Sequence, residues 1–371
     1  MRPVTKGKGA SYAPAATVSW KRYNNEGNQT ASYTALITVF NIKNYPDPLV
    51  RNVADCLLMV LKINLKVVKG PKAQPAKNAI MNKVSEVYKL ASGPLVKAVG
   101  AFCAFCETSI PGLVEVEHVA NKAMYPTYMV KWENFLPTCG PCNTAKGNKP
   151  DRDTVASWKP AIDANQLKDK PFYDRIRADY TWPDLDSDTY QFFPLDFQMS
   201  DDDGDTWESL SLADAANLKV NFLASSNLQQ RKVWATLKHG RNVYQGVQVR
   251  VQVKPVDQDL VKLCQLNKNE ASAGTYDRRA YNRTLAWFSA LDILRPLMQI
   301  DDEEQFLQLW PLVHYASAAM GFWSLWVTLL SQFDDFEQPP KDLGYWLYSD
   351  PRAANFYPGT DKSNIVIPPR Q

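Results

Sequence analysis

The sequence predicts an α+β protein in which a small zinc-binding module lies within a mostly helical chain. Two Cys-x-x-C pairs predict the module, a strictly alternating run at 247–253 predicts a strand, and apolar residues at helical spacing predict helices on both sides. The 371 residues are enough for two or three domains with a large core. We expect an accessory region at 1–98, the zinc module at 99–165 and a regulatory or interaction region at 166–371.

The zinc prediction rests on the spacing of four cysteines. Two tight Cys-x-x-C turns, 32 residues apart, supply four thiolates, the ligand set of a closed structural zinc site. Disulfides are the alternative, but no secretory context accompanies the paired spacing. We therefore expect structural Zn²⁺ on Cys103, Cys106, Cys139 and Cys142.

The accessory region combines strand and helix signals. Residues 17–40 have strand character, clearest at 34–40. Asp47 and Pro48 are expected to open a helix as N-cap and first helical residue, and further helical segments are expected at about 76–91 and 95–99. The buried stripe of the first helix is Leu49, Val53, Leu57, Val60 and Leu61.

The region after the module is acidic and turn-rich before it becomes helical. The acidic run at 201–205 lacks the glutamate of an EF-hand loop, so we interpret it as a solvated turn. Residues 210–240 are expected to form helix. Arg279 and Arg283 either face phosphate or pair with the acidic run at 301–304, and we favour pairing.

The run at 310–330 contains no Asp, Glu, Lys or Arg. Three features argue against a membrane segment. Polar residues interrupt the run, acidic residues flank it on both sides, and it is barely long enough to span a bilayer. We interpret it as a buried, tryptophan-rich helix that would also suit a subunit interface.

The location of the protein in the cell is predicted from two features. The N-terminus has no apolar h-region of a signal peptide. Cys56 and Cys264 lie in apolar helical surroundings, as expected of reduced core thiols, so we expect a cytoplasmic protein without membrane contact.

Three residues near the cysteines suggest hydrolytic chemistry. His118 is one of three histidines, and a neutral imidazole can take a proton from water near pH 7. Glu117 and Asn143 offer oxygen ligands that suit Mg²⁺ or Mn²⁺. A base beside such an ion is what phosphodiester hydrolysis needs. The alternative is a loop histidine in a zinc module that only binds.

Positive charge near these residues is local, because the net charge of the chain is only +3. Lys122, Lys146 and Lys149 are candidates for contacts with nucleic acid. Lys146 is favoured because it lies three residues beyond Asn143, on the same helix face. For any single one of them, an ordinary solvated position is an equal alternative. Arg2, Lys6 and Lys8, near the N-terminus, could also contact phosphate, and a solvated tail is an equal alternative.

The motifs C-x-x-C-E, V-E-H-V, W-x-N-F-L and C-x-x-C-N-x-x-K-G-N resemble the HNH endonucleases with the ββα-metal fold, in the branch with two flanking Cys-x-x-C pairs. About fifty residues match in order and spacing. The resemblance implies that His118 is the general base at the end of the first strand and that Asn134 braces its loop. It implies that Glu117 and Asn143 hold the catalytic metal. Asn121 stands where many members have proline, which removes the rigidity of that residue.

The resemblance extends to nuclease subunits that work beside an ATPase in Septu-like and retron defence systems. It implies a metal-dependent endonuclease that cuts DNA and acts as the effector of an antiphage system. The sequence contains no G-x-x-x-x-G-K-[ST] loop, so a sensor or ATPase partner would be a separate chain, and self-assembly is another possible trigger. The alternative is a non-catalytic zinc subunit that binds nucleic acid or protein.

Overall fold

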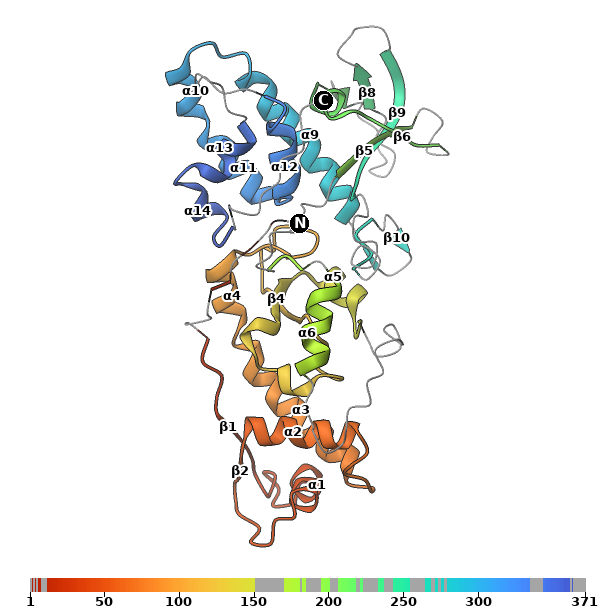
Figure 1. Cartoon of the computed structure of the whole chain (residues 1–371), viewed down its shortest axis with the longest axis vertical. Helices are drawn as coiled ribbons and strands as arrows, with labels where there is room; N and C mark the ends of the chain where they lie inside the picture. The colour runs from red at the N-terminus through yellow and green to blue at the C-terminus, as the bar shows by residue number, and fades with distance from the viewer. Residues whose placement is uncertain are drawn as a thin grey trace.

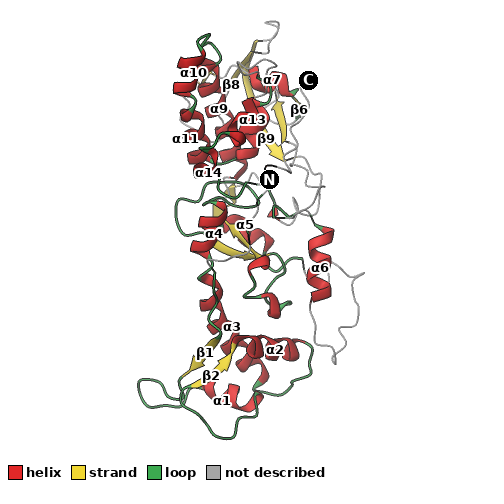
Figure 2. Ribbon diagram, turned by 60° about the vertical axis from the view of Figure 1, so that its left-hand side comes forward, coloured by secondary structure: helices red, strands yellow, loops and turns green. Residues whose placement is uncertain are grey.

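The computed structural model describes an elongated chain built as three parts along its long axis (Figure 1). The chain combines helices with small antiparallel sheets, so the α+β class is confirmed at this level (Figure 2). The described residues are 2, 4, 6–7, 12–150, 170–180, 182–184, 195–200, 206–217, 221–222, 233–236, 243–253, 264–267, 271–272, 275–276, 279–333, 343–360 and 362.

The N-terminal part packs helices against one β-hairpin. Strands β1 (Thr17–Trp20) and β2 (Leu49–Asn52) pair antiparallel. The helices are α1 (Ala31–Val39), α2 (Val53–Asn64), α3 (Ala73–Lys89) and α4 (Ser92–Val99).

Two expectations for this part are wrong, one in the type of the element and one in the residue at which it begins. Residues 34–40, predicted as strand, lie mostly in α1, whose N-cap Thr30 accepts a hydrogen bond from the Tyr33 amide. The helix expected at Asp47 begins only after Asn52, which caps α2 through the Ala54 amide. In both places a side-chain cap and burial of one helix face outweigh local propensity. The predicted apolar stripe is nevertheless buried.

The middle part carries the cysteines. Strand β3 (Glu115–His118) pairs antiparallel with β4 (Phe135–Thr138), and helix α5 (Gly140–Lys146) follows β4 directly. Two 3-10 turns lie between the strands, η1 (Pro126–Tyr128) and η2 (Trp132–Asn134). Helix α6 (Lys170–Asp179) lies alongside this part (Figure 1).

The C-terminal part joins a sheet to a helical layer. The sheet has the order β6-β5-β9-β8-β7, and its longest strand is the predicted one. Its strands are β5 (Leu195–Ser200), β6 (Glu208–Ser209), β7 (Asn221–Phe222), β8 (Val233–Thr236) and β9 (Val243–Val253). Helix α7 (Leu212–Asn217) lies between β6 and β7 in the chain. A separate hairpin of β10 (Ala271–Ser272) and β11 (Thr275–Tyr276) follows β9. The helices are α9 (Arg279–Leu297), α10 (Glu303–Leu309), α11 (Pro311–Met320), α12 (Trp323–Leu330), α13 (Leu343–Ser349) and α14 (Ala353–Phe356).

Two further expectations concern residues of the C-terminal part. The single helix predicted across 210–240 is wrong where the chain is described, because α7 is short and β7 and β8 are strands. The run at 310–330 is helical, but it is broken into α11 and α12 at Gly321 and Phe322, which both have positive φ. The expected burial holds for α12 and only in part for α11, where Leu312 and Tyr315 are exposed. The acidic run at 201–205 lies outside the described residues. Among the described helices, none has the length and apolar character needed to cross a membrane.

Two hydrophobic cores meet at the middle part. One core joins the N-terminal helices to Phe135, and the other joins the cysteines to the C-terminal helices through Leu136. Successive side chains of a strand point to opposite faces, so β4 presents one residue to each core. The segment between the cysteine pairs is thus held from both sides.

Candidate functional site

The four cysteines form a buried cluster. Their Sγ atoms all lie within 4.8 Å of one another, and those of Cys106 and Cys139 are 3.7 Å apart. A tetrahedral ion with Zn–S bonds of about 2.3 Å separates its sulfurs by roughly 3.8 Å. Within the described residues this is the only group of three or more His, Cys, Asp or Glu side chains close enough to share an ion. The donor set fits structural Zn²⁺.

A guanidinium lies directly beside the sulfurs. Arg279 of α9 is buried and donates from Nη1 to Cys142 Sγ at 3.0 Å, while its other hydrogen bonds go to the carbonyls of Cys264 and Gln265. Arg283, one turn later, donates to the carbonyls of Val251 and Leu266. The predicted pairing of these arginines with 301–304 is therefore wrong: both bind backbone carbonyls beneath the cysteines. Positive charge at this place suits a site that holds four thiolates around one dication.

The cysteine segment also docks the C-terminal helices. Glu107 follows the first pair, and its carboxylate accepts hydrogen bonds from the amide and the hydroxyl of Ser324 in the first turn of α12. Its carbonyl accepts from the Phe322 amide at 2.9 Å. A carboxylate at a helix N-terminus satisfies amides that have no partner within the helix. The glutamate of the C-x-x-C-E motif thus joins the zinc module to α12.

The two strands and α5 place the predicted catalytic side chains. Glu115 and Glu117 alternate along β3 and so share one face, against which α5 packs. From α5, Asn143 Nδ2 donates to Glu115 Oε2, and Lys146 Nζ lies 2.5 Å from Glu117 Oε1. His118 ends the strand. Two side-chain pairs therefore join the helix to the strand next to the histidine.

His118 is buried, and its ring is held on three sides. Its Nε2 lies 2.9 Å from the Met129 carbonyl, and because a carbonyl only accepts, this nitrogen carries the hydrogen. The rings of Tyr88 and Phe135 meet it edge-on, with centroids 4.6 and 5.3 Å away. Burial lowers the pKa of His118 to about 3, although the Met129 carbonyl opposes this shift. The imidazole is neutral at pH 7, with Nδ1 able to accept a proton.

Asn134 holds the loop that follows the histidine. Its Oδ1 accepts from the Ala120 amide at 2.8 Å, and its Nδ2 donates to the carbonyls of Ala120 and Tyr128 at 3.0 Å each. Its own carbonyl accepts from the Val119 amide. The side chain is completely buried, so these bonds fix the backbone directly after His118.

Asn121 stiffens the same loop. Its Oδ1 accepts from the Met124 amide at 3.0 Å, and its Nδ2 donates to the Asn148 carbonyl, which ties the loop to the end of α5. The loss of rigidity expected from the missing proline is therefore wrong: hydrogen bonds to the asparagine side chain restrain this loop.

The three lysines predicted to contact nucleic acid lie in different environments. Lys146 is fully buried and bonds to Glu117 and to the His118 carbonyl, so it does not face solvent. Lys122 is half-buried, donates to the Tyr88 hydroxyl at 2.6 Å and lines the pocket described below. Lys149 is exposed beyond the end of α5.

A pocket of about 450 Å³ opens beside His118. It is lined by Glu117, His118, Lys122 and Asn143, which are four of the seven residues predicted to act in catalysis or nucleic-acid contact. Asn134, Lys146 and Lys149 lie outside the lining. Tyr88 and Glu115 also line the pocket and were not predicted. Glu115 could have been found from its place two residues before Glu117, whereas Tyr88 comes from α3 and has no local signal.

The oxygen donors at this pocket suit a hard cation. Glu115, Glu117 and Asn143 supply carboxylate and amide oxygens, the ligands that Mg²⁺ or Mn²⁺ takes in proteins. Burial raises the pKa of Glu117, and the ammonium of Lys146 opposes this shift. The donor chemistry fits the ion, with Lys146 already supplying one positive charge to Glu117.

The N-terminus crosses the middle part as a strap, here defined as Arg2, Val4, Lys6 and Gly7. Arg2 donates to the carbonyls of Val99 and Pro358, and Val4 bridges Thr360 and bonds to the Pro183 carbonyl. These contacts lie within the protein, and both Arg2 and the Lys6 side chain are nearly inaccessible. The expectation of a solvated or phosphate-binding tail is therefore wrong for Arg2 and Lys6.

The comparisons with known proteins concern a limited segment. Over 71 residues the chain is 42% identical to the Septu protein PtuB of Bacillus thuringiensis. The match covers 18% of this chain and 27% of that protein, so the chain spans about a quarter of the length of this relative. No family model and no solved structure matches. The chain therefore has a distant, partial similarity to a Septu PtuB protein, joined to a four-cysteine cluster of zinc-site geometry.

Proposed function

We propose that this protein is a metal-dependent HNH endonuclease that cuts DNA as a component of an antiphage defence system. The observation that carries the proposal is the neutral His118, set at the end of β3 in a pocket that also contains Glu117 and Asn143. The order of strand, loop, strand and helix around it is what a ββα-metal element requires. The partial similarity to a Septu protein supports the defence context.

The residues divide the chemistry among them. His118 would accept the proton of the attacking water at Nδ1, because Nε2 is occupied by the Met129 carbonyl. Asn134 would keep the histidine loop in place. Glu117 and Asn143 would hold Mg²⁺ or Mn²⁺, which when bound neutralises charge on the scissile phosphate. Lys122, which lines the pocket, would contact a phosphate.

DNA is the proposed substrate, and a 5′-phosphate and a 3′-hydroxyl are the proposed ends. A sensor or ATPase chain is the proposed partner that restrains or targets cleavage. Self-assembly of this chain is the other proposed trigger. The C-terminal part joins the zinc module through Glu107 and Arg279, so a partner bound there would be connected to the site by direct contacts.

The proposal is tested by incubating supercoiled plasmid with the protein and Mg²⁺ or Mn²⁺, with and without EDTA. Wild type should nick or linearise the plasmid, and His118→Ala and Glu117→Gln should not, while both variants keep their zinc. Glu26→Gln is the matched control, because Glu26 is an exposed carboxylate that does not line the pocket. Cleavage by His118→Ala at the wild-type rate would refute the assignment of the base. Binding of DNA without nicking would favour the non-catalytic zinc subunit.

A further inference from the structure

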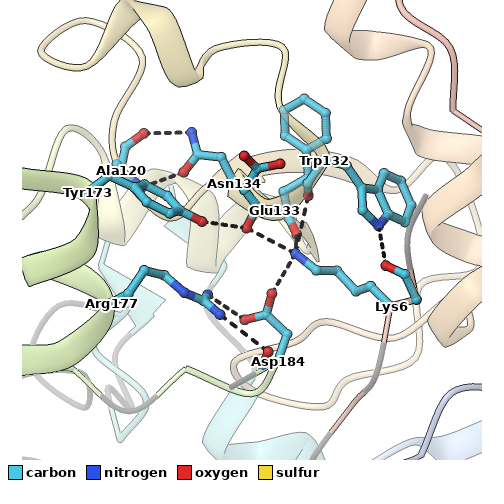
Figure 3. Close-up of polar contacts among 10 residues, drawn as sticks. Lys6, Ala120, Trp132, Glu133, Asn134, Tyr173, Arg177 and Asp184 are labelled. Carbon is cyan, nitrogen blue, oxygen red and sulfur yellow. Dashed lines mark hydrogen bonds and ion pairs between the residues drawn. The ribbon is translucent and has the colours of Figure 1, made fainter. Parts of the chain in front are cut away.

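Lys6 of the strap makes four contacts in the interior of the middle part. Its Nζ donates to the carbonyls of Trp132, Glu133 and Phe135 at 3.3, 3.2 and 2.6 Å, and it lies 2.5 Å from Asp184 Oδ2. Figure 3 shows this ammonium between the Asp184 carboxylate and the turn that carries Asn134. One lysine therefore satisfies the carbonyls on both sides of the asparagine.

The carboxylate that meets Lys6 is itself shared. Arg177 of α6 donates to Asp184 through Nη1 at 2.7 Å and to its carbonyl through Nη2 at 3.3 Å. The Lys6 and Asp184 side chains are 6% and 2% exposed, so the ion pair is shielded from water. Tyr173 of α6 adds a hydrogen bond to the Glu133 carbonyl at 2.8 Å. Two sequence-distant segments, the strap and α6 with Asp184, thus converge on one turn.

This turn reaches the histidine loop through one side chain. Asn134 ends η2, and its amide group holds Ala120 and Tyr128, as described above. Lys6 fixes the backbone that presents Asn134, and Asn134 fixes the backbone directly after His118. The ammonium also contributes positive charge next to these carbonyls, and an uncharged side chain of the same length would remove one donor from each of them.

We propose that Lys6 is a positioning residue of the His118 site, and that activity at that site depends on the N-terminal strap being seated with Lys6 against these carbonyls. This inference rests on the proposed nuclease function. It extends that function to a residue more than a hundred positions from His118 in the chain. The carbonyl contacts of Lys6 position the turn, and the ion pair with Asp184 contributes to the stability of the fold.

Two variants separate positioning from stability. Lys6→Met removes the contacts with the carbonyls but leaves Asp184 paired with Arg177, so the melting temperature should fall moderately. Asp184→Asn keeps Lys6 against the carbonyls but leaves its buried charge without a carboxylate, so the melting temperature should fall further. Each variant is assayed for kcat and KM on plasmid, for melting temperature and for zinc content. Hydrogen exchange of residues 119–135 is measured in parallel.

We expect kcat and melting temperature to rank the two variants in opposite order. Lys6→Met should lower kcat about tenfold to a hundredfold with KM within about twofold, because a small displacement of a catalytic group costs about this much. It should speed exchange at 119–135 and leave 139–146 unchanged. Asp184→Asn should retain kcat within about threefold despite its lower melting temperature. If kcat follows melting temperature in both variants, or if Lys6→Met leaves both kcat and exchange at wild-type values, the inference is overturned.

The exchange measurement keeps the two proposals separate. If wild type itself does not cut DNA with any metal, the proposed function fails. Faster exchange at 119–135 in Lys6→Met would then still support the link from the strap to the histidine loop. Unchanged exchange would overturn that link independently of cleavage.

Discussion

The Nζ atom of Lys146 lies 2.5 Å from Oε1 of Glu117, and both side chains are buried. The carboxylate proposed to hold a catalytic metal is thus already neutralised by an internal cation. Of its two oxygens, Oε1 faces the lysine, and the residue also lines the pocket. Lys146 therefore serves the site from within, by holding Glu117 and the His118 carbonyl at the end of β3.

Removal of this lysine should destabilise the protein strongly. Lys146→Met leaves a buried carboxylate without its partner, and breaking such a pair costs about 3–5 kcal/mol. The free energy of unfolding is measured by urea denaturation. Adding Glu117→Gln in the same chain should restore most of the loss, because the unpaired charge is gone. Equal stability of wild type and Lys146→Met would show that the pair is not formed.

The four cysteines should hold zinc and the fold together. Cys139→Ala should lose the metal and melt early, because metal binding in small zinc sites contributes about 10 kcal/mol or more. Cys56→Ala is the matched control, since Cys56 is buried in the other core and lies outside the cluster. Metal content by mass spectrometry and thermal melting check both variants. A Cys139→Ala protein that keeps zinc and melts like the control would exclude the site.

Gly321 separates α11 from α12 at the contact with the zinc module. Its φ is +77°, and a Cβ atom there would meet the Glu107 carbonyl oxygen at 2.4 Å and the Ser109 amide nitrogen at 2.6 Å. Gly321→Ala should lower the free energy of unfolding by at least about 2 kcal/mol, because the left-handed backbone alone disfavours a side chain by about 1–2 kcal/mol and backbone atoms cannot easily move aside. Gly112→Ala, where a Cβ meets open space, should cost little. Similar melting of the two variants would contradict the close packing.

Features set by local spacing could be predicted from the sequence, and features set by distant contacts could not. The cysteine cluster and strand β9 follow from residues close together in the chain. The strand expected at 34–40 is helix in the structure, where Thr30 caps α1 and Tyr33, Leu36 and Ile37 are buried by tertiary packing, which local propensity does not report.

The candidate site shows the same division. The motif places His118 at the end of a strand next to another one, as the structure has it. The burial of Lys146 could not be predicted, because a short helix shows no periodicity that distinguishes the face against β3 from the solvent face. The proposed positioning role of Lys6 depends on Asp184 and on the turn at 132–135, more than a hundred residues away in the chain. The sequence around Lys6 therefore could not predict it.

The contribution of Asp184 to stability should depend on pH. Burial by itself would raise the pKa of Asp184, but Lys6 and Arg177 overcome it and hold this pKa below its ordinary value. A carboxyl group whose pKa is lower in the folded state binds fewer protons there than in the unfolded chain. Its stabilisation is therefore fully present above the unfolded pKa of about 3.9 and is lost as the pH falls through the folded pKa.

Urea denaturation of wild type and Asp184→Asn between pH 2.5 and pH 6 measures this contribution. The difference in unfolding free energy should be constant from about pH 5 to pH 6 and should shrink below about pH 4, as the carboxylate becomes protonated and resembles the amide. Asp179→Asn is the matched control, because Asp179 of the same α6 segment forms only a surface pair with Arg175. A difference for Asp184→Asn that stays constant down to pH 2.5, or one that Asp179→Asn reproduces, would show that the buried Lys6–Asp184–Arg177 contacts do not stabilise the carboxylate.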